Sequence, residues 1–418
     1  MKDVSVGLFN DSFVPIIDGV TVTVRNYAYW LNEFLGPTCV VAPSAPFHSE
    51  GEDFPVLRFF SIPTFVHPPY RIGLPNMDWR LRGSLEKRDF SILHAHSPFG
   101  AGRAALKTSR EAGVPIVATF HSKFRDNLRL AIPFKSVVDE EVKRIVEFYY
   151  SVDHVWVPQE SVAATLREYG YQGPYEVVEN GIDYDPPEDI LPLREQGGKL
   201  LGTSGEKAVG LFVGQHILEK NLEFLVRSLP AIMAAVPDFR MVFVGQGCAR
   251  CRLQMLVSRL GIADRVLFYG PISDREKLAA VYARGDLFLF PSLWDNAPLV
   301  VREAAAFKTP SVLLRDSTAA EVIRDGVNGF LADDERRLYE LVWKRTLASQ
   351  MVPATLNTVS VDLAAGSAHG FRVSGTTVID PGFLAVYEEG KDAKTEDDDE
   401  EGRKLPEMKP GDRIPLTE

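Results

Sequence analysis

The sequence predicts an α/β protein with two doubly wound, Rossmann-like domains that face one cleft, followed by a small α+β appendage. Three observations lead to this prediction. Short apolar, β-rich runs alternate with helical patterns through residues 4–180, and the alternation restarts at residue 208. A segment rich in proline, glycine and charge lies between the two series. After residue 334 the alternation stops. Because such alternation indicates parallel sheets covered by helices, we expect domains at 1–185 and 208–334, a linker at 186–207 and an appendage at 335–418.

Composition places the chain among soluble globular proteins, with 45% hydrophobic and 25% charged residues. No apolar run approaches the roughly 20 residues of a membrane helix. The first residues, MKDVSVGLFND, are too polar for a signal peptide. Three cysteines indicate a reducing compartment rather than a disulfide framework. We therefore expect a cytoplasmic protein.

Most of the net charge of −11 lies in one acidic tract. Residues 388–401 hold nine acidic residues and two lysines, a composition typical of a solvated, disordered segment. The rest of the chain is near neutral. Charge therefore gives no reason to expect a nucleic-acid partner.

Two short patterns resemble metal sites. Cys248 and Cys251 form a CxxC pair, but a structural zinc needs two further ligands and none is evident. Asp183 and Asp185 form a DxD pattern inside the predicted linker, where we interpret it as incidental. We expect neither a metal nor another cofactor.

The first predicted strand, VSVGLFN, leads through a loop into a helix that starts near Gly19. A backbone without a Cβ lets a sugar or phosphate approach closely there, although a plain strand-to-helix turn explains the same pattern. His94, His96 and His121 follow later strands at their carboxyl ends, where ligands of doubly wound sheets bind. We select His121 as the histidine that faces the cleft; a purely structural histidine is the alternative.

A basic segment with interleaved apolar residues follows at 123–135. Its cations are Lys123, Arg125, Arg129 and Lys135. Such a segment could rest on an anionic membrane surface. A solvated helix face is the simpler interpretation.

In the second series, Lys220 stands just before a helix and after a strand that ends at Gly214. A lysine there is placed to bind a diphosphate as a point charge, although most lysines are ordinary surface residues. Gly245, in the turn VGQG, offers another close approach to a ligand. Pro271 and Ile272, after the next strand, could hold a base through main-chain groups.

The strongest pattern is PSLWDNAPLVVREAAAF, which follows a short buried strand in RGDLFLFPS and leads through a loop into a helix. Asp295 lies in the loop and Glu303 lies in the helix, with seven residues between them. The first amides of such a helix are unpaired and, with the helix dipole, favour an anion such as phosphate. We interpret the stretch as part of a nucleotide-sugar pocket. A buried helix with an ordinary N-terminal Asp is the alternative.

Several stretches together resemble one enzyme family: VGQHILEKNLEFLV, VFVGQG, RVLFYGPISDREKLAAVYARGDLFLFPSLWDNAPLVVREAAAFKTPSV and EVIRDGVNGFLADD. They are similar to the retaining family-4 glycosyltransferases of the GT-B fold. FVPIIDGV, HAHSPFG and ATFHS resemble the N-terminal half of that family, so the match covers residues 1–333.

The resemblance implies a role for each candidate. Lys220 would neutralise the donor diphosphate, Asp295 would hold the sugar and Glu303 would hold the ribose. His121 would touch the sugar and Gly19 would line the phosphate cleft. The predicted catalytic residues are therefore His121, Lys220 and Asp295, and the predicted substrate-binding residues are Gly19, Gln215, Gly245, Pro271, Ile272, Asn296, Ala297, Leu299, Val300 and Glu303.

Two departures from the family pattern stand out. Gln215 occupies a position where an arginine is usual, which removes one phosphate cation. Residues 317–320 (STAA) replace a glycine-rich turn before Glu321. The leaving diphosphate can be stabilised by Lys220 and helix amides, so no metal is required.

The last part of the chain resembles a different family. LYELVWKRTLASQM, FRVSGTTVIDPGFLAVYEEG and LPEMKPGDRIPL are similar to an internal piece of a type IA DNA topoisomerase. Neither Tyr339 nor Tyr387 matches the catalytic tyrosine motif of that family. The first of these runs is an amphipathic helical pattern. The helix that braces the cleft in the glycosyltransferases is not found here.

We therefore expect a glycosyltransferase that moves a hexose from a UDP- or GDP-sugar to a lipid such as diacylglycerol, or to a glycan. It would work in the cytoplasm, with peripheral attachment to the inner face of the cell membrane through 123–135. The alternatives are a catalytically impaired chimera and a DNA-binding topoisomerase fragment.

Overall fold

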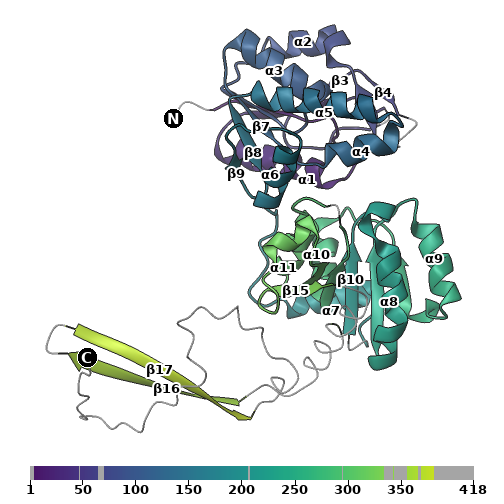
Figure 1. The fold of residues 1–418 in the computed structure, drawn as a ribbon, viewed down its shortest axis with the longest axis vertical. Coiled ribbons are helices and arrows are strands. Elements are labelled where there is room, and N and C mark those ends of the chain that lie inside the picture. Colours follow the sequence, from purple (N-terminus) through teal and green to yellow (C-terminus); the bar gives the residue numbers. More distant parts are fainter. Residues whose placement is uncertain are drawn as a thin grey trace.

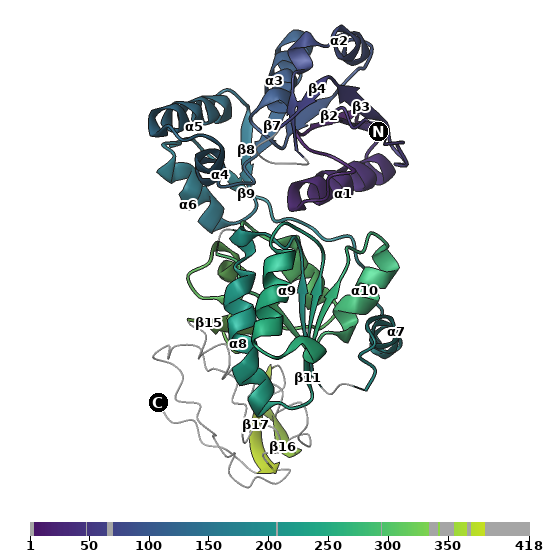
Figure 2. The same ribbon diagram turned by 90° about the vertical axis from the view of Figure 1, so that its right-hand side faces the viewer.

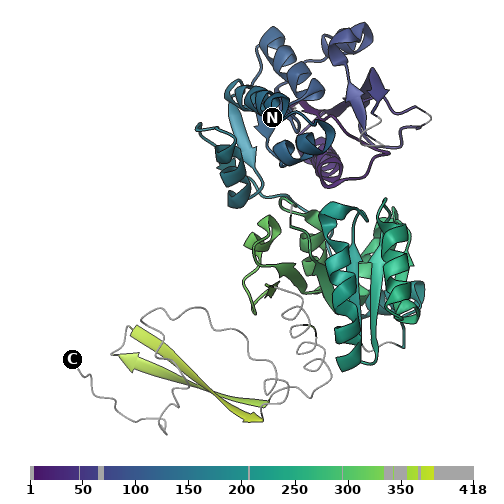
Figure 3. The ribbon, with the colours of Figure 1, turned by 45° about the vertical axis from the view of Figure 1, so that its right-hand side comes forward.

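The computed structural model describes residues 4–46, 48–64, 70–205, 208–293, 295–333, 342, 355–365 and 369–380. It contains two parallel α/β domains, which confirms the expected architecture. Figures 1 and 3 show the domains one above the other, with a two-stranded ribbon beyond the C-terminal domain.

Seven parallel strands form the N-terminal sheet, in the order β3-β2-β1-β6-β7-β8-β9. The chain runs outward from β1 to β3 and then returns to β6 on the other side of β1, so the strand order reverses between β1 and β6. The strands are β1 (Val6–Phe9), β2 (Thr38–Pro43), β3 (Val56–Phe59), β6 (Ile92–Ala95), β7 (Ile116–Thr119), β8 (His154–Val157) and β9 (Glu176–Val177), and a separate hairpin pairs β4 (Ser61–Pro63) with β5 (Arg71–Gly73).

Helices cover this sheet through two apolar clusters, one on each face. The α1 helix begins where Asp18 accepts a hydrogen bond from the Thr21 amide at 2.7 Å, the usual side-chain cap of a helix N-terminus. The helices are α1 (Gly19–Phe34), η1 (Pro75–Met77), α2 (Trp79–Leu85), α3 (Gly100–Ala112), α4 (Phe124–Ala131), α5 (Lys135–Tyr150) and α6 (Glu160–Glu168).

Six parallel strands form the C-terminal sheet, in the order β12-β11-β10-β13-β14-β15. Here the order reverses between β10 and β13. Figure 2 shows α8 and α9 on one side of this sheet and α7 and α10 on the other. The strands are β10 (Ala208–Val213), β11 (Phe239–Val244), β12 (Val266–Tyr269), β13 (Leu287–Phe290), β14 (Ser311–Leu314) and β15 (Gly329–Ala332).

The helical segments of this domain surround one large apolar core. They are α7 (Leu191–Leu201), η2 (Leu218–Lys220), α8 (Leu222–Ala235), α9 (Arg250–Arg259), η3 (Ala263–Arg265), α10 (Arg275–Arg284), α11 (Leu299–Ala306) and η4 (Thr318–Val322).

The segment 186–207, which we expected to be a linker, contains α7, so the prediction of an irregular segment is wrong there. The helix has proline among its first two residues, and Gly202 follows its last residue with φ 63°. Both are usual at helix ends. Gly197 lies against α10, where an added Cβ would be 2.0 Å from the Ala280 carbonyl oxygen. A Gly-Gly pair that suggested a loop is therefore a close contact between two helices.

This contact predicts the effect of Gly197→Ala. In most helices alanine stabilises by up to about 1 kcal/mol relative to glycine. Here the new methyl group meets backbone that cannot move aside, and overpacking of this kind costs roughly 1–3 kcal/mol. We expect urea unfolding to show a lower free energy of unfolding. Gly83→Ala in α2 is the matched control: an added Cβ there meets nothing within 4 Å, so that variant should be as stable as the parent chain or more stable.

The appendage is described in part. Strands β16 (Thr355–Ala365) and β17 (His369–Asp380) pair antiparallel and supply β structure of the expected α+β appendage. The expected amphipathic helix lies outside the described residues except for Val342, and the acidic tract lies outside them as well.

Candidate active site

The two sheets turn their points of strand reversal toward each other. Ligands of doubly wound sheets bind outside the carboxyl ends of strands at such points. Two hydrogen bonds join the facing loops. Asn296 donates its amide to the His121 carbonyl oxygen at 3.1 Å, and Gln215 donates to the Ile17 carbonyl oxygen at 3.2 Å. The candidate site therefore lies where the ends of β1, β6 and β7 meet those of β10 and β13.

Lys220 and Asp295 form the charged centre of this site. Lys220 ends η2 in the loop after β10, and Asp295 lies in the loop after β13. The Lys220 Nζ donates to both oxygens of Asp295, at 2.6 and 2.7 Å, and lies 5.5 Å from the centroid of the Phe290 ring. Both side chains are about four-fifths buried, with 18% and 23% exposure. The structure thus brings together two predicted residues that are 75 positions apart in the chain.

The loop after Asp295 presents backbone amides. Ala297 is held at φ 43°, in the left-handed region that few residues other than glycine adopt. Helix α11 starts at Leu299 without a side-chain cap. Within the described part of the chain, nothing accepts a hydrogen bond from the amides of Ala297, Leu299 or Val300. Such unpaired amides at a helix N-terminus are suited to an anion.

Glu303 lies on α11 but contacts a different group of residues. It accepts a hydrogen bond from the Tyr282 hydroxyl at 2.7 Å, and its other oxygen is 3.8 Å from the guanidinium of Arg275. Burial raises the pKa of the Glu303 carboxyl, while the Tyr282 hydrogen bond and Arg275 oppose that rise. Among the described residues, Glu303 forms no hydrogen bond or ion pair with Lys220 or Asp295. Of the three predicted residues, Lys220 and Asp295 therefore form one ion pair, and Glu303 is a separate buried carboxylate.

Sequence reasoning missed both partners of Glu303. Arg275 begins α10, directly after the predicted base-binding turn, and its guanidinium covers the Tyr184 ring at 4.0 Å. It also donates to the Asp183 carbonyl oxygen at 2.6 Å. Asp183 thus lies against α10, and the described residues contain no group of three or more potential metal ligands. A signal was present in Arg275, a cation at the start of a predicted helix.

His121 belongs to a buried cluster of three histidines in the N-terminal domain. The His96 Nδ1 and His121 Nε2 atoms are 3.0 Å apart, so one of them donates to the other. His94 Nε2 is 2.7 Å from the Thr119 hydroxyl, and its ring lies 3.9 Å from that of His96. Burial lowers the pKa of His94 to about 3 and that of His121 to about 4, and it lowers the pKa of His96 as well. All three rings are therefore neutral at pH 7.

This cluster predicts a loss of stability in mild acid. A histidine in the unfolded chain has a pKa near 6.5. As the pH falls from 6.5 toward 4, the unfolded chain binds protons that the folded cluster excludes, so the free energy of unfolding decreases. His216, which is also buried and has a pKa lowered by burial to about 4, adds to the effect. Urea unfolding between pH 7 and pH 5 should show this decrease; His121→Asn should weaken it, and exposed His154→Asn should not.

Gly19 and Gln215 lie on the other side of the site. An added Cβ at Gly19 would meet nothing within 4 Å, so the space beside it is open. Asp18, next to it, also accepts a hydrogen bond from the Tyr70 hydroxyl at 3.0 Å. Gln215 uses its side chain to contact the Ile17 carbonyl oxygen. The residue that stands where an arginine is usual therefore joins the two domains.

The remaining predicted residues follow β11 and β12. An added Cβ at Gly245 would be 2.0 Å from the Gly214 carbonyl oxygen. The close approach of this neighbouring loop therefore explains the glycine without a ligand. Pro271 is exposed, and Ile272 packs against the core. In the described part of the chain, neither of these two residues forms a hydrogen bond with the Lys220 loop.

The basic segment 123–135 is partly engaged within the protein. Lys123 donates to the Thr318 hydroxyl at 2.7 Å. Arg125 pairs with Glu168 at 3.0 Å and covers the Tyr169 ring. Arg129 and Lys135 are exposed. No helix among the described residues has both the length and the apolar character needed to cross a membrane.

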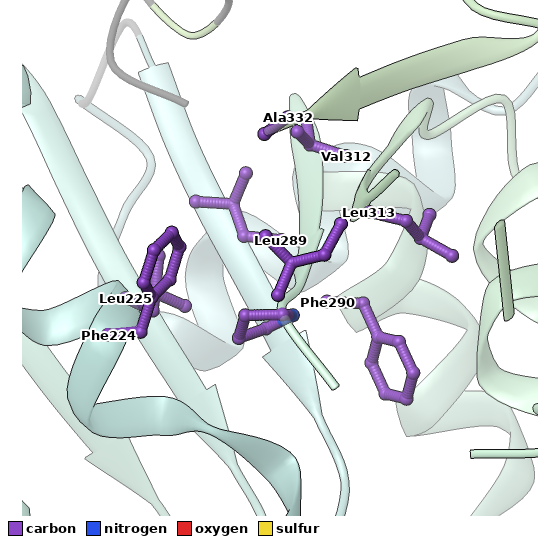
Figure 4. A pocket seen from close by; sticks show the side chains of 9 residues that line it. Phe224, Leu225, Leu289, Phe290, Val312, Leu313 and Ala332 are labelled. Carbon is purple, nitrogen blue, oxygen red and sulfur yellow. The ribbon is translucent and has the colours of Figure 1, made fainter. Parts of the chain in front are cut away.

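A small cavity of about 10 Å³ lies between α8 and strands β13 to β15 (Figure 4). Its lining is apolar and offers no charged group to a phosphate. The lining residues are Phe224, Leu225, Leu289, Phe290, Pro291, Val312, Leu313, Leu314 and Ala332.

Three family models match the chain. The model for glycosyl transferases group 1 matches residues 199–344, and the model for Glycosyltransferase Family 4 matches residues 17–186. The model for DNA topoisomerase matches residues 315–418. It therefore begins before residue 335, where we expected the appendage to start, and it overlaps the first match over 315–344.

Curated relatives follow the same division. The alpha-monoglucosyldiacylglycerol synthase of Streptococcus pneumoniae is 24% identical over 349 residues, which cover 82% of this chain and 78% of that protein. The GDP-mannose-dependent alpha-mannosyltransferase of Corynebacterium glutamicum is 26% identical over 345 residues, covering 80% and 78%. DNA topoisomerase 1 of Xylella fastidiosa is 51% identical over 142 residues. These cover 34% of this chain but only 17% of the topoisomerase.

Solved structures share the fold of the two main domains. Anabaena HepE, in complex with UDP, superposes with a TM-score of 0.63 at 18% identity, covering 83% of this chain and 91% of that one. WaaG, a glycosyltransferase of lipopolysaccharide biosynthesis, gives 0.62 at 16% identity, with coverage of 82% and 90%. The expected GT-B architecture is confirmed.

Proposed function

Because the chain belongs over most of its length to the retaining family-4 glycosyltransferases of the GT-B fold, we propose that it transfers a hexose from a UDP- or GDP-linked sugar. Its C-terminal segment matches part of a DNA topoisomerase. The acceptor is a lipid such as diacylglycerol, or a glycan. This proposal is carried by the ion pair of Lys220 and Asp295 and by the nearby amides of Ala297, Leu299 and Val300, which have no acceptor among the described residues.

In this proposal the Lys220 ammonium and the amides of Ala297, Leu299 and Val300 bind the donor diphosphate. Asp295 accepts hydrogen bonds from hydroxyls of the sugar. Glu303, already buried and hydrogen-bonded, takes the ribose hydroxyls. His121, two residues after the end of β7, meets the sugar from the N-terminal domain. Charge-assisted hydrogen bonds of this kind are worth roughly 1.5–3 kcal/mol each.

The bond from the anomeric carbon to the diphosphate oxygen breaks, and the acceptor hydroxyl attacks from the same face. Its proton passes to the departing phosphate oxygen. Lys220 and the amides stabilise the negative charge that develops on the leaving group, where fixed donors are most effective.

The lipid acceptor draws support from the glycolipid synthase among the relatives and from the exposed Arg129 and Lys135. These cations would face an anionic membrane surface on the cytoplasmic side. The glycan acceptor remains part of the proposal because the relatives also include a mannosyltransferase.

Calorimetric titration of the full chain with UDP and with GDP tests the proposal. We expect one of the two to bind with a stoichiometry near one. Turnover assays with the matching nucleotide sugars, and with diacylglycerol vesicles or glycans, then identify the donor and acceptor. Absence of binding to both nucleotides would contradict the proposal.

A second candidate function is DNA binding by residues 335–418, favoured by the topoisomerase match. The acidic tract opposes it, because phosphate contacts need positive charge. A gel shift with single-stranded DNA at low salt decides between the two: a shift without nucleotide binding supports the second candidate.

A further inference from the structure

One group of contacts joins the domains away from the Lys220 and Asp295 pair. It is made by η4 of the C-terminal domain and by the start of α6 in the N-terminal domain. The Glu321 carboxylate accepts hydrogen bonds from the backbone amides of Glu160 and Ser161, at 2.9 and 2.8 Å. These are the first two residues of α6, whose amides have no partner within their own helix. Figures 1 and 2 show α6 on the side of its domain that faces the other domain.

The start of α6 has no cap of its own. Its N-cap residue, Gln159, makes no side-chain capping hydrogen bond and is 97% buried, with 3% exposure. The side-chain nitrogen of Gln159, Nε2, instead donates to the Thr318 carbonyl oxygen at 2.6 Å. A negative charge at a helix N-terminus is favoured by the unpaired amides and by the helix dipole. Glu321 of the C-terminal domain thus caps α6, a helix of the N-terminal domain.

Thr318 adds a side-chain contact. Its hydroxyl oxygen accepts a hydrogen bond from the Lys123 ammonium at 2.7 Å. Residues 317–320 replace a glycine-rich turn in the family pattern, and glycine has no side-chain oxygen to offer. This contact is therefore a property of the present sequence. It also explains why Lys123, in a segment that resembles a membrane-facing one, points into the protein.

The position of Lys123 links these contacts to the candidate site. Lys123 and His121 are two residues apart in the loop after β7. The same loop receives the hydrogen bond from Asn296, the residue that follows Asp295. Holding Lys123 against η4 therefore also holds His121 against the loop that carries Asp295.

We propose that Thr318 and Glu321 form an interdomain clasp that positions the His121 loop over the nucleotide-sugar site. The clasp consists of Thr318 and Glu321 on one side and Lys123, Gln159 and the first two amides of α6 on the other. Its members are positioning residues, since they act through His121 and do not touch the donor. This inference rests on the proposed function for its kinetic part only.

Glu321→Ala in the full chain tests the clasp through three measurements. The clasp predicts faster hydrogen exchange at Glu160 and Ser161 and also in residues 121–125, which Glu321 does not contact. It predicts a kcat at least tenfold lower, with a Kd for UDP or GDP within twofold of the parent value, because the clasp acts on the His121 loop of the N-terminal domain and not on Lys220 or the α11 amides. Glu195→Ala, which removes an exposed carboxylate on α7, is the matched control and should change none of these.

Unchanged exchange in residues 121–125, or a kcat within twofold of the parent, would overturn the clasp. If the parent chain turns over no nucleotide sugar, the proposed function fails, while the exchange in residues 121–125 still decides whether the clasp exists.

If Glu321→Ala does not fold, two milder variants test the clasp. Thr318→Gly and Lys123→Met each remove one partner of the same hydrogen bond. Each should lower kcat at least threefold, and the double variant should lower it no further than either single one. Additive losses, or no loss in either variant, would contradict the clasp.

Discussion

Lys220→Met should weaken nucleoside diphosphate binding by about 10- to 150-fold, the equivalent of one charge-assisted hydrogen bond of roughly 1.5–3 kcal/mol. The ammonium is the positive group beside the free amides of α11, and its removal also leaves Asp295 as an uncompensated negative charge facing the phosphates. Turnover should fall as well, because the same group stabilises the departing diphosphate. Calorimetry gives the change in Kd, and initial rates give the change in kcat.

The control for this variant is Lys107→Met on α3. Lys107 is half exposed and forms only a 3.8 Å pair with Glu111 within its own helix. The Lys107→Met variant should bind nucleotide with the same Kd as the parent chain. Equal Kd values for Lys220→Met and the parent would remove Lys220 from the diphosphate site.

Asp295→Ala should change binding in the opposite direction. In the ion pair Asp295 competes with phosphate for the Lys220 ammonium, since both of its oxygens accept from Nζ. Without Asp295 the ammonium is free, and UDP or GDP should bind at least threefold more tightly. Turnover should nevertheless fall by about 100-fold, or about 2.7 kcal/mol, because the sugar loses a charged partner in the transition state.

This pairing of tighter product binding with slower turnover distinguishes a donor site from a structural ion pair. A structural pair would lose stability in both variants and would show no opposite effect on nucleotide affinity. Asp264→Asn, an exposed carboxylate in η3, provides the matched control for charge alone. Melting temperatures measured alongside show whether either variant has lost its fold.

The ion pair could be predicted from sequence because it depends on few steps. Lys220 and Asp295 each follow a clear apolar strand, and the two strands become neighbours once the second domain is taken as doubly wound. Residues at the carboxyl ends of neighbouring parallel strands lie close together. The sequence therefore predicted this architecture and placed both residues at the same edge of the sheet, but it did not predict the ion pair itself.

The surroundings of Glu303 could not be predicted in the same way. Whether Glu303 contacts Asp295 or Tyr282 depends on how α11 is rotated about its axis, which the spacing of seven residues does not determine. The contact between Lys123 and Thr318 joins residues 195 positions apart in different domains. It depends on how the two domains are oriented, and no local pattern records that. Helix α7 was missed for a related reason. Its glycine at 197 is explained by the close approach of α10, which lies far away in the sequence.

The contacts that hold residues 179–201 against the C-terminal domain restrict where the chain between the domains can bend. Val178 still pairs with β8 of the N-terminal domain through its amide. Glu179 already forms an ion pair with Arg302 of α11, and Asp183 is bound by Arg275. The pivot is thus only a few residues long. A pivot this short limits relative movement of the two domains to rotation about it, and along this connection it keeps them from moving apart.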